Sequence, residues 1–272
     1  MNWRAIFAIV RKDLKVVLQN KGVIIPIVAL PLILFGLLPW LTVFVPNLSN
    51  MGGSDMEDLA ALIAQMPAGL QNELAPYTIE QQTIVFFLVY MLAPMFLILP
   101  LMVASVIAAD SFAGERERRT LEALLYTPTT DQELFVGKLL SSWIPAIVVA
   151  LAGFLLYIVM ANAAAWPTMG QIFFPNWMWV VLVLWVAPAA AGLGLSSMVL
   201  VSARAQGFQD AYQTGGLIVL PILLLVFGQV SGVMYFSVWV VLLLGLLLWV
   251  IDIALIWFGS RTFRRGRLIA RL

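Results

Sequence analysis

The sequence predicts an all-α integral membrane protein with an N-terminal amphipathic helix, six transmembrane helices and both termini in the cytoplasm. The 272 residues are 62% hydrophobic and 11% charged, with a mean hydropathy of +1.00. A soluble domain is about half apolar and about a quarter charged, so a water-soluble globule is excluded. Six long apolar runs and a one-sided distribution of basic residues supply the number of spans and their orientation.

Each apolar run is long enough to cross a bilayer as a helix, which takes about 20 residues. The expected spans are residues 22–46, 84–109, 139–161, 177–203, 212–228 and 235–257. Prolines inside the runs predict kinked, tightly packed helices, because neighbouring helices must satisfy the carbonyls that each proline leaves free. Residues 1–272 therefore read as a single transmembrane domain.

The 15 basic residues orient these spans. With six spans, all of them fall before the first, between the second and third, between the fourth and fifth, or after the sixth, which is one side of the membrane. The positive-inside rule makes that side cytoplasmic. The outer segment, residues 47–83, carries no base and has these acids: Asp55, Glu57, Asp58, Glu73 and Glu80.

The first 21 residues predict a helix that lies in the inner membrane interface. Its expected apolar face is Trp3, Phe7, Val10, Leu14, Val17 and Leu18, and its expected basic face is Arg4, Arg11, Lys12 and Lys15. An apolar stripe opposite Lys and Arg suits contact with acyl chains and anionic headgroups together. The alternative is a cleaved or merely basic leader.

A second short amphipathic helix is expected in the outer segment, at residues 54–66. Ser54 and Glu57 form a capping-box pattern, and apolar residues then recur at helical spacing. The helix is interpreted as a lid that packs over the span ends, or as an element that gates or contacts substrate.

Several kinds of chemistry are excluded by missing residues. The chain has no cysteine and no histidine, which excludes disulfides, thiolate nucleophiles, His-based acid–base catalysis and His- or Cys-based metal sites. No GxxxxGK[ST] phosphate loop occurs. We therefore expect no enzyme, no catalytic or metal site and no cofactor in this chain, and energy for active transport would have to come from a partner.

The inner loop at residues 110–138 is the most informative segment. Asp110 and the mixed charges at 115–119 favour ion pairs at helical spacing, and a small apolar face of leucines follows. Thr127-Pro128 ends that helix, and Thr130 with Glu133 forms a capping box for the next one. A short helix of this kind suits docking into a groove on a cytoplasmic partner. The alternative is an ordinary charged loop.

This loop resembles the signature region of type-2 ABC transporter permeases. The residues that carry the likeness are Gly114-Glu115-Arg116-Glu117, Thr120-Leu121-Glu122, Leu124-Leu125, Thr127-Pro128 and Gly137-Lys138. Within that class the chain is most similar to bacterial sodium-efflux and drug-export permease subunits, and the likeness in topology covers the whole chain, with an interfacial elbow helix and six spans.

The resemblance implies that the inner loop is a coupling helix that fits a cleft on a separate ATPase subunit. The residues implied to contact the ATPase are Glu115, Arg119, Thr120, Leu121, Glu122, Leu124 and Leu125. ATP and Mg²⁺ would be bound by that partner, and the chain would sit in the cell's inner membrane. Two departures are the small outer segment and the short loop at 228–234, which argue against a large polar substrate or a periplasmic docking platform.

One six-span subunit is small for an export pathway, so we expect a second copy or a related permease as partner, with no nucleic acid. Small residues in the fourth span would allow close helix approach, either at the dimer seam or within the subunit: Ala187, Ala191, Gly192 and Gly194.

Three polar residues in or near the spans are candidates for a pathway or for structural roles. Asp252 is the acid that lies well inside a span, where a carboxylate is costly and often functional. We favour structural pairing with Arg204 or a base of the N-terminal helix over a cation or proton site. Asp210 and Gln213, at the inner mouth of span five, are weaker candidates.

The leading hypothesis is the membrane subunit of an ABC exporter, with two copies forming the pathway and two ATPase subunits on the inner loops. The alternative is an ATP-independent channel, scaffold or assembly factor. An intramembrane enzyme acting on lipid is the weakest hypothesis, because no acid–base set is present.

Overall fold

The computed structural model describes residues 2–48, 61, 64–118, 129–231 and 234–262. This part of the chain is helical and contains no strand, which confirms the predicted all-α class. Six of its helices or helical stretches are long and apolar enough to cross a membrane.

The six spans coincide with the six predicted runs to within a few residues, except where the helices run on further. Span one is α2 (Lys21–Pro31), η1 (Leu32–Leu37) and α3 (Leu38–Leu48); span two is α6 (Ile79–Val85), η2 (Phe86–Met91), α7 (Leu92–Phe96), α8 (Ile98–Ala109) and η3 (Asp110–Gly114). Span three is α11 (Asp131–Met169); span four is α12 (Trp177–Val181), η4 (Leu182–Val186) and α13 (Ala187–Ser202). Span five is α14 (Phe208–Gly215), η5 (Gly216–Val219) and α15 (Leu220–Val230); span six is α16 (Val238–Thr262). With 39 residues, α11 is about 58 Å long at 1.5 Å per residue, and so it extends beyond the hydrocarbon core.

Spans two and four form the centre of the bundle. In their most apolar stretches 72% and 67% of the residues are buried, against 17–28% in the other four spans. A side chain at Gly194 would lie 2.4 Å from the Leu101 carbonyl of α8, and one at Gly192 would lie 2.3 Å from Asp252 of α16. Ala187, Ala191, Gly192 and Gly194 are all buried. Of the two roles expected for these small residues, packing within the subunit is therefore the one that the structure supports.

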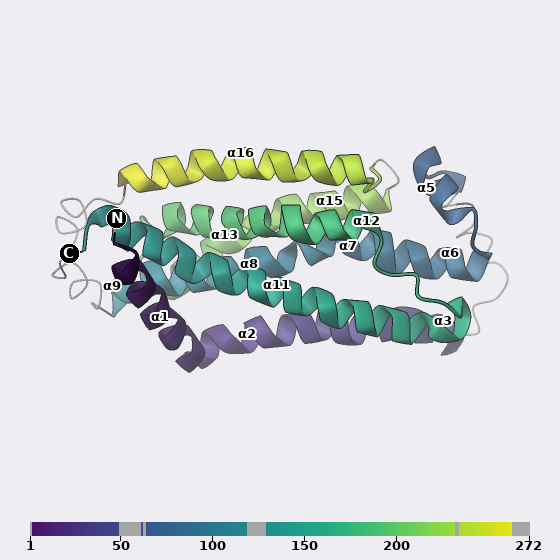
Figure 1. Ribbon diagram of the computed structural model, residues 1–272, viewed down its shortest axis with the longest axis horizontal. Helices are drawn as coiled ribbons and strands as arrows, with labels where there is room; N and C mark the ends of the chain where they lie inside the picture. The colour runs from purple at the N-terminus through teal and green to yellow at the C-terminus, as the bar shows by residue number, and fades with distance from the viewer. Residues whose placement is uncertain (1, 49–60, 62–63, 119–128, 232–233, 263–272) are drawn as a thin grey trace.

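The bundle has two distinct ends (Figure 1). At one end, called the α1 end, lie α1 (Trp3–Gln19), α9 (Glu115–Glu117) and the beginning of α11. At the other, called the α5 end, lie α5 (Ala68–Leu74), the beginning of α6 and the end of α3. Helix α1 is inclined to the bundle and packs against α11 and α2.

Four π-helical stretches interrupt the spans, three of them close to a proline. η1 follows Pro31, while η2 and η4 precede Pro94 and Pro188. A proline has no N–H to continue the α-helical hydrogen-bond pattern, and π-helical turns occur mostly as short insertions within α-helices.

In η2, three successive carbonyls accept hydrogen bonds from side chains of three other spans. The bonds run from Tyr157 Oη to Leu88 O, from Trp179 Nε1 to Val89 O at 2.7 Å, and from Gln229 Nε2 to Tyr90 O at 2.7 Å. Backbone groups in a membrane must be satisfied within the protein, so these bonds hold span two against spans three, four and five.

The outer segment is described only in part. The helix expected at 54–66 lies largely outside the described residues, as does its capping pair Ser54 and Glu57. After that stretch, the structure has α5 at Ala68–Leu74, which buries Leu70 and Leu74, and span two begins at Ile79 with Thr78 and Gln81 forming its capping box.

Candidate functional site

Asn2 is the N-cap of helix α1, and its side chain accepts a hydrogen bond from the Arg4 N–H at 3.1 Å. Its inward face is buried against the spans and consists of Ile6, Ile9, Val10, Asp13 and Val17. A Cβ at Gly137 of α11 would lie 3.0 Å from Ile9, so the glycine allows the two helices to touch.

The predicted apolar face of this helix is only partly right. Val10 and Val17 turn inward, whereas Trp3, Phe7 and Leu18 remain 54%, 60% and 68% exposed. The helix therefore has two apolar faces, one for the protein and one for the surroundings. Lys12, expected on the basic face, also lies against the protein.

A buried ion network joins α1 to both ends of the inner loop. Lys138, which is completely buried in α11, donates to Glu115 Oε2 at 2.5 Å and to the Ser111 carbonyl at 2.6 Å. Glu115 also accepts a hydrogen bond from Lys12 of α1. Asp13 completes the network, with its Oδ1 3.0 Å from Lys12 Nζ and its Oδ2 4.0 Å from Lys138 Nζ.

The network balances two positive charges against two negative ones. Asp13 further accepts hydrogen bonds from the hydroxyls of Ser111 at 3.0 Å and Ser141 at 3.1 Å. Buried charges are tolerated when they are paired and their remaining hydrogen bonds are satisfied. Burial by itself would lower the pKa of Lys12, but the hydrogen bond to Glu115 and the charges of Asp13 and Glu115 outweigh it and raise that pKa. Lys12 is therefore charged throughout the physiological pH range.

Two further contacts extend this arrangement to spans one and five. Asp110, at the end of span two, accepts from Arg118 Nη1 at 3.0 Å and from Asn20 Nδ2 at 3.2 Å. Glu117 accepts from the Phe208 N–H at 2.9 Å, which places a carboxylate at the beginning of α14, where an anion is favoured. Elements of spans one, two, three and five thus meet around the loop.

Of the residues expected to dock an ATPase, the structure describes only Glu115, which is buried in the ion network. Its carboxylate bonds to two lysines of the same chain, so contact with a partner would require both bonds to rearrange. Arg119, Thr120, Leu121, Glu122, Leu124 and Leu125 lie outside the described residues. The capping box of Thr130 and Glu133 is present as predicted.

Asp252 does not form the expected ion pair. Within the described chain its closest polar contact is Ser196, whose Oγ lies 3.5 Å from Oδ1, and Oδ2 has no hydrogen-bond partner. Arg204 is exposed and is not among its partners. The carboxylate is 1% exposed and fits against Gly192, which leaves no room there for a larger side chain.

The other two polar candidates lie on the surface of α14. Asp210 is exposed and accepts a hydrogen bond from the Gln206 N–H at 2.8 Å, so it stabilises the turn before the helix. Gln213, three residues further on, is also exposed. Neither residue is brought together with Asp252.

A second polar cluster lies at the α5 end. Glu73 of α5 accepts hydrogen bonds from the hydroxyls of Tyr90 in span two and of Tyr235, which precedes span six, the latter at 2.5 Å. The two tyrosine rings are 5.5 Å apart, and a Cβ at Gly69 would lie 3.1 Å from Tyr235. These hydrogen bonds therefore hold α5 against span two and against the segment that precedes span six. Burial and the hydrogen bond to Glu73 raise the pKa of Tyr235.

Sequence reasoning missed Asp13, Lys138 and Glu73 as site residues. Asp13 carried a signal, because it is the acid in an otherwise basic amphipathic helix. Lys138 belongs to the inner-loop motif, but the sequence pattern indicated only that it is a base on the cytoplasmic side of the membrane. The tyrosine partners of Glu73 are distant in sequence, and no local pattern points to them.

The ion network is interpreted as structural, because it joins α1, the inner loop and α11. Among the residues that the structure describes, no group of three or more acids, histidines or cysteines is arranged to hold a metal ion. The network can transmit force between α1, the inner loop and the spans, because its bonds join all three.

Comparison with known proteins agrees with this architecture. No curated protein and no solved structure matches the chain. Residues 7–236, which include most of α1, the inner loop and the first five spans, match the family described as ABC-2 family transporter protein. The chain is thus a member of the ABC-2 transporter family, as the sequence motif and the six spans had indicated.

Proposed function

We propose that this chain is the membrane subunit of an ATP-driven exporter, in which two copies form the pathway and two separate ATPase subunits contact the 110–138 loops. Membership of the ABC-2 family gives a permease subunit of an ABC transporter. ATP and Mg²⁺ are bound by the partner in this proposal. The α1 end faces the cytoplasm of a cell whose inner membrane holds the protein.

The observation that carries the coupling role is the ion network at the two ends of the loop. Glu115 lies four residues before the 119–128 stretch and Lys138 lies ten residues after it, and the distance between Glu115 Oε2 and Lys138 Nζ is 2.5 Å. The described segments on the two sides of that stretch are therefore joined by a buried ion pair. Since buried pairs resist separation, a push on the loop moves spans two and three and the attached α1 together.

The docking surface proposed for the ATPase is the apolar face that the sequence predicts for Leu121, Leu124 and Leu125, together with Arg119, Thr120 and Glu122. A short apolar helix face in a groove is a common mode of recognition. Glu115 contributes from inside, by fixing the loop's first end.

The test is co-purification of an ATPase with the tagged full-length chain from cells that produce both proteins at native levels. The variant L124D/L125D places two charges on the apolar face, and L124I/L125I keeps the face apolar as the matched control. We expect the ATPase to accompany the wild type and the isoleucine variant, and to be lost from the aspartate variant.

Two outcomes would contradict the proposal. An aspartate variant that retains the ATPase would overturn the docking surface. A wild type that carries no ATP-binding partner, even after cross-linking in the membrane, would favour an ATP-independent channel, scaffold or assembly factor. A monodisperse elution profile of each variant shows that the six spans have folded.

A further inference from the structure

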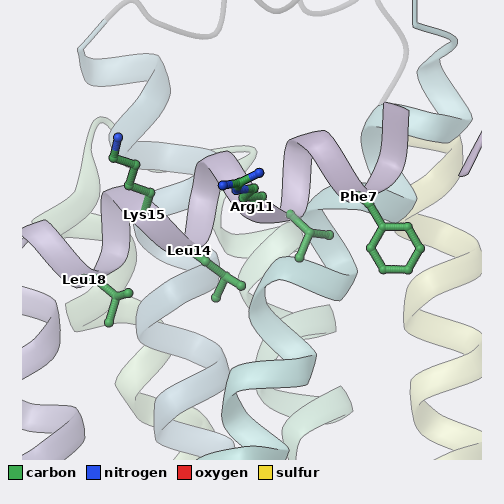
Figure 2. A pocket seen from close by; sticks show the side chains of 6 residues that line it. Phe7, Arg11, Leu14, Lys15 and Leu18 are labelled. Atoms are coloured by element: carbon green, nitrogen blue, oxygen red, sulfur yellow. The ribbon is translucent and has the colours of Figure 1, made fainter. Parts of the chain in front are cut away.

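A groove of about 450 Å³ runs along the outer face of α1. Its lining residues are Phe7, Val10, Arg11, Leu14, Lys15 and Leu18. In Figure 2, Phe7, Leu14 and Leu18 point from α1 toward the side on which the spans run, and Lys15 points the opposite way. The groove is therefore apolar on its membrane side and basic along its rim.

The two bases on the rim have no acidic partner among the residues that the structure describes. Arg11 and Lys15 are exposed, and in the described part of the chain no carboxylate lies within ion-pair distance of either. Lys12, their neighbour, differs because it turns toward Asp13 and Glu115. The positive charges of Arg11 and Lys15 therefore lie beside two apolar residues, Phe7 and Leu18, which are 60% and 68% exposed.

We propose that this groove is a binding site for an acidic glycerophospholipid. The phosphate and anionic headgroup lie between Arg11 and Lys15, and an acyl chain covers Phe7, Leu14 and Leu18. The occupant follows from the chemistry of the groove: a helix with an apolar face and a basic rim lies in the membrane interface, where acyl chains cover the first and anionic headgroups neutralise the second. A zwitterionic headgroup leaves both positive charges uncompensated.

This site connects lipid to the ion network through a single helix. Apart from Val10, which belongs to the buried inward face, the groove residues lie on one side of α1, and Ile9 and Asp13 on its other side contact α11. A lipid that holds α1 in place therefore also holds the helix that supplies Lys12 to Glu115. The inference concerns a lipid site outside any transport pathway, and it stands whether or not the chain exports anything.

The experiment is native mass spectrometry of the purified full-length chain, incubated with equal amounts of phosphatidylglycerol and phosphatidylcholine that carry the same acyl chains. The wild type should retain phosphatidylglycerol in preference. Each base near a membrane surface contributes about fivefold to the affinity for anionic lipid, so R11Q/K15Q should lower the preference by about 25-fold. The matched control R4Q removes an exposed base of the same helix that does not line the groove, and it should keep the preference.

A third variant tests the apolar half of the groove. Leu18→Ser should reduce retention of both lipids by a similar factor, because it removes acyl-chain contact and leaves the charges in place. Equal retention of the two lipids by the wild type would overturn the proposal. So would a loss in R4Q as large as that in R11Q/K15Q, since the charge effect would then be unspecific. Leu18 and the three bases named for substitution are surface residues, so these variants should fold.

Discussion

Replacing Lys138 with methionine removes one of the two positive charges in the buried network and keeps the length of the side chain. Glu115 and Asp13 would then share Lys12 alone, which leaves one negative charge uncompensated at a place where both carboxylates are at most 5% exposed. Removing one partner of a buried ion pair costs about 3–5 kcal/mol. For a protein of this size, that corresponds to a fall of about 6–20 °C in the melting temperature.

The reasoning also predicts that a second substitution repairs the first. In E115Q/K138M the remaining charges are Lys12 and Asp13, which already lie 3.0 Å apart. The double variant should therefore be more stable than K138M alone, although each single substitution is destabilising, and this non-additivity is what a double-mutant cycle measures.

The assay is thermal unfolding of the purified full-length protein in one detergent, followed by the loss of its monodisperse peak. R4M is the matched control, because Arg4 is exposed at the same end of the bundle and should change stability by less than about 0.5 kcal/mol. The account is refuted if K138M is no less stable than R4M, or if the effects of E115Q and K138M simply add.

Three other predictions follow from the bundle and its orientation. Gly194→Ala should cost about 1–3 kcal/mol, because its Cβ would lie 2.4 Å from a carbonyl of span two, whereas Gly216→Ala meets nothing within 4 Å and should be tolerated; equal melting temperatures would contradict this packing. Asp252→Asn should leave the melting temperature unchanged or raise it, because the buried carboxylate has no basic partner in the described chain, and a clear fall would show that its charge is used. The chain lacks cysteine, so Glu80→Cys and Gln213→Cys can each be labelled singly. A membrane-impermeant maleimide should reach position 80 in intact cells and position 213 only after permeabilisation; the reverse pattern would invert the proposed topology.

The long-range bonds inside the bundle illustrate what could not be predicted. The six spans follow from apolar runs whose length matches a bilayer, and a local count is enough to find them. The pairing of Lys138 with Glu115 and Asp13 joins residues that are 23 and 125 positions from it in the sequence. Only the packing of α1 across α11 brings them together, and a one-residue rotation of that helix would separate them.

The role of small residues shows the same limit. Ala187, Ala191, Gly192 and Gly194 indicated a close helix contact, but their sequence was compatible with a contact inside the subunit or between subunits. The neighbours of Gly192 and Gly194 are Asp252, Leu101 and Ser105 of the same chain. Which helix faces these residues depends on the three-dimensional arrangement. Only the structure could therefore distinguish a contact inside the subunit from a contact between subunits.

Asp252 was correctly placed in a membrane span and incorrectly paired. An intramembrane acid is visible in any sequence, because charge is rare there. The identity of its neighbour depends on which face of α16 meets α13, and that face presents Ser196 and Gly192.

The sequence by itself indicated that the chain lies in a lipid bilayer, how many spans it has and which family it belongs to. Hydropathy, the distribution of basic residues and the inner-loop motif are local patterns, so they can be recognised along the sequence. The tertiary structure decided which of those residues are partners. It brought Asp13, Glu115 and Lys138 into one buried ion network, left Arg11 and Lys15 without an acidic partner in the described part of the chain, and held α5 in place through Glu73. The physical reason is that ion pairing and burial depend on distances across helices, which periodicity along one helix does not specify.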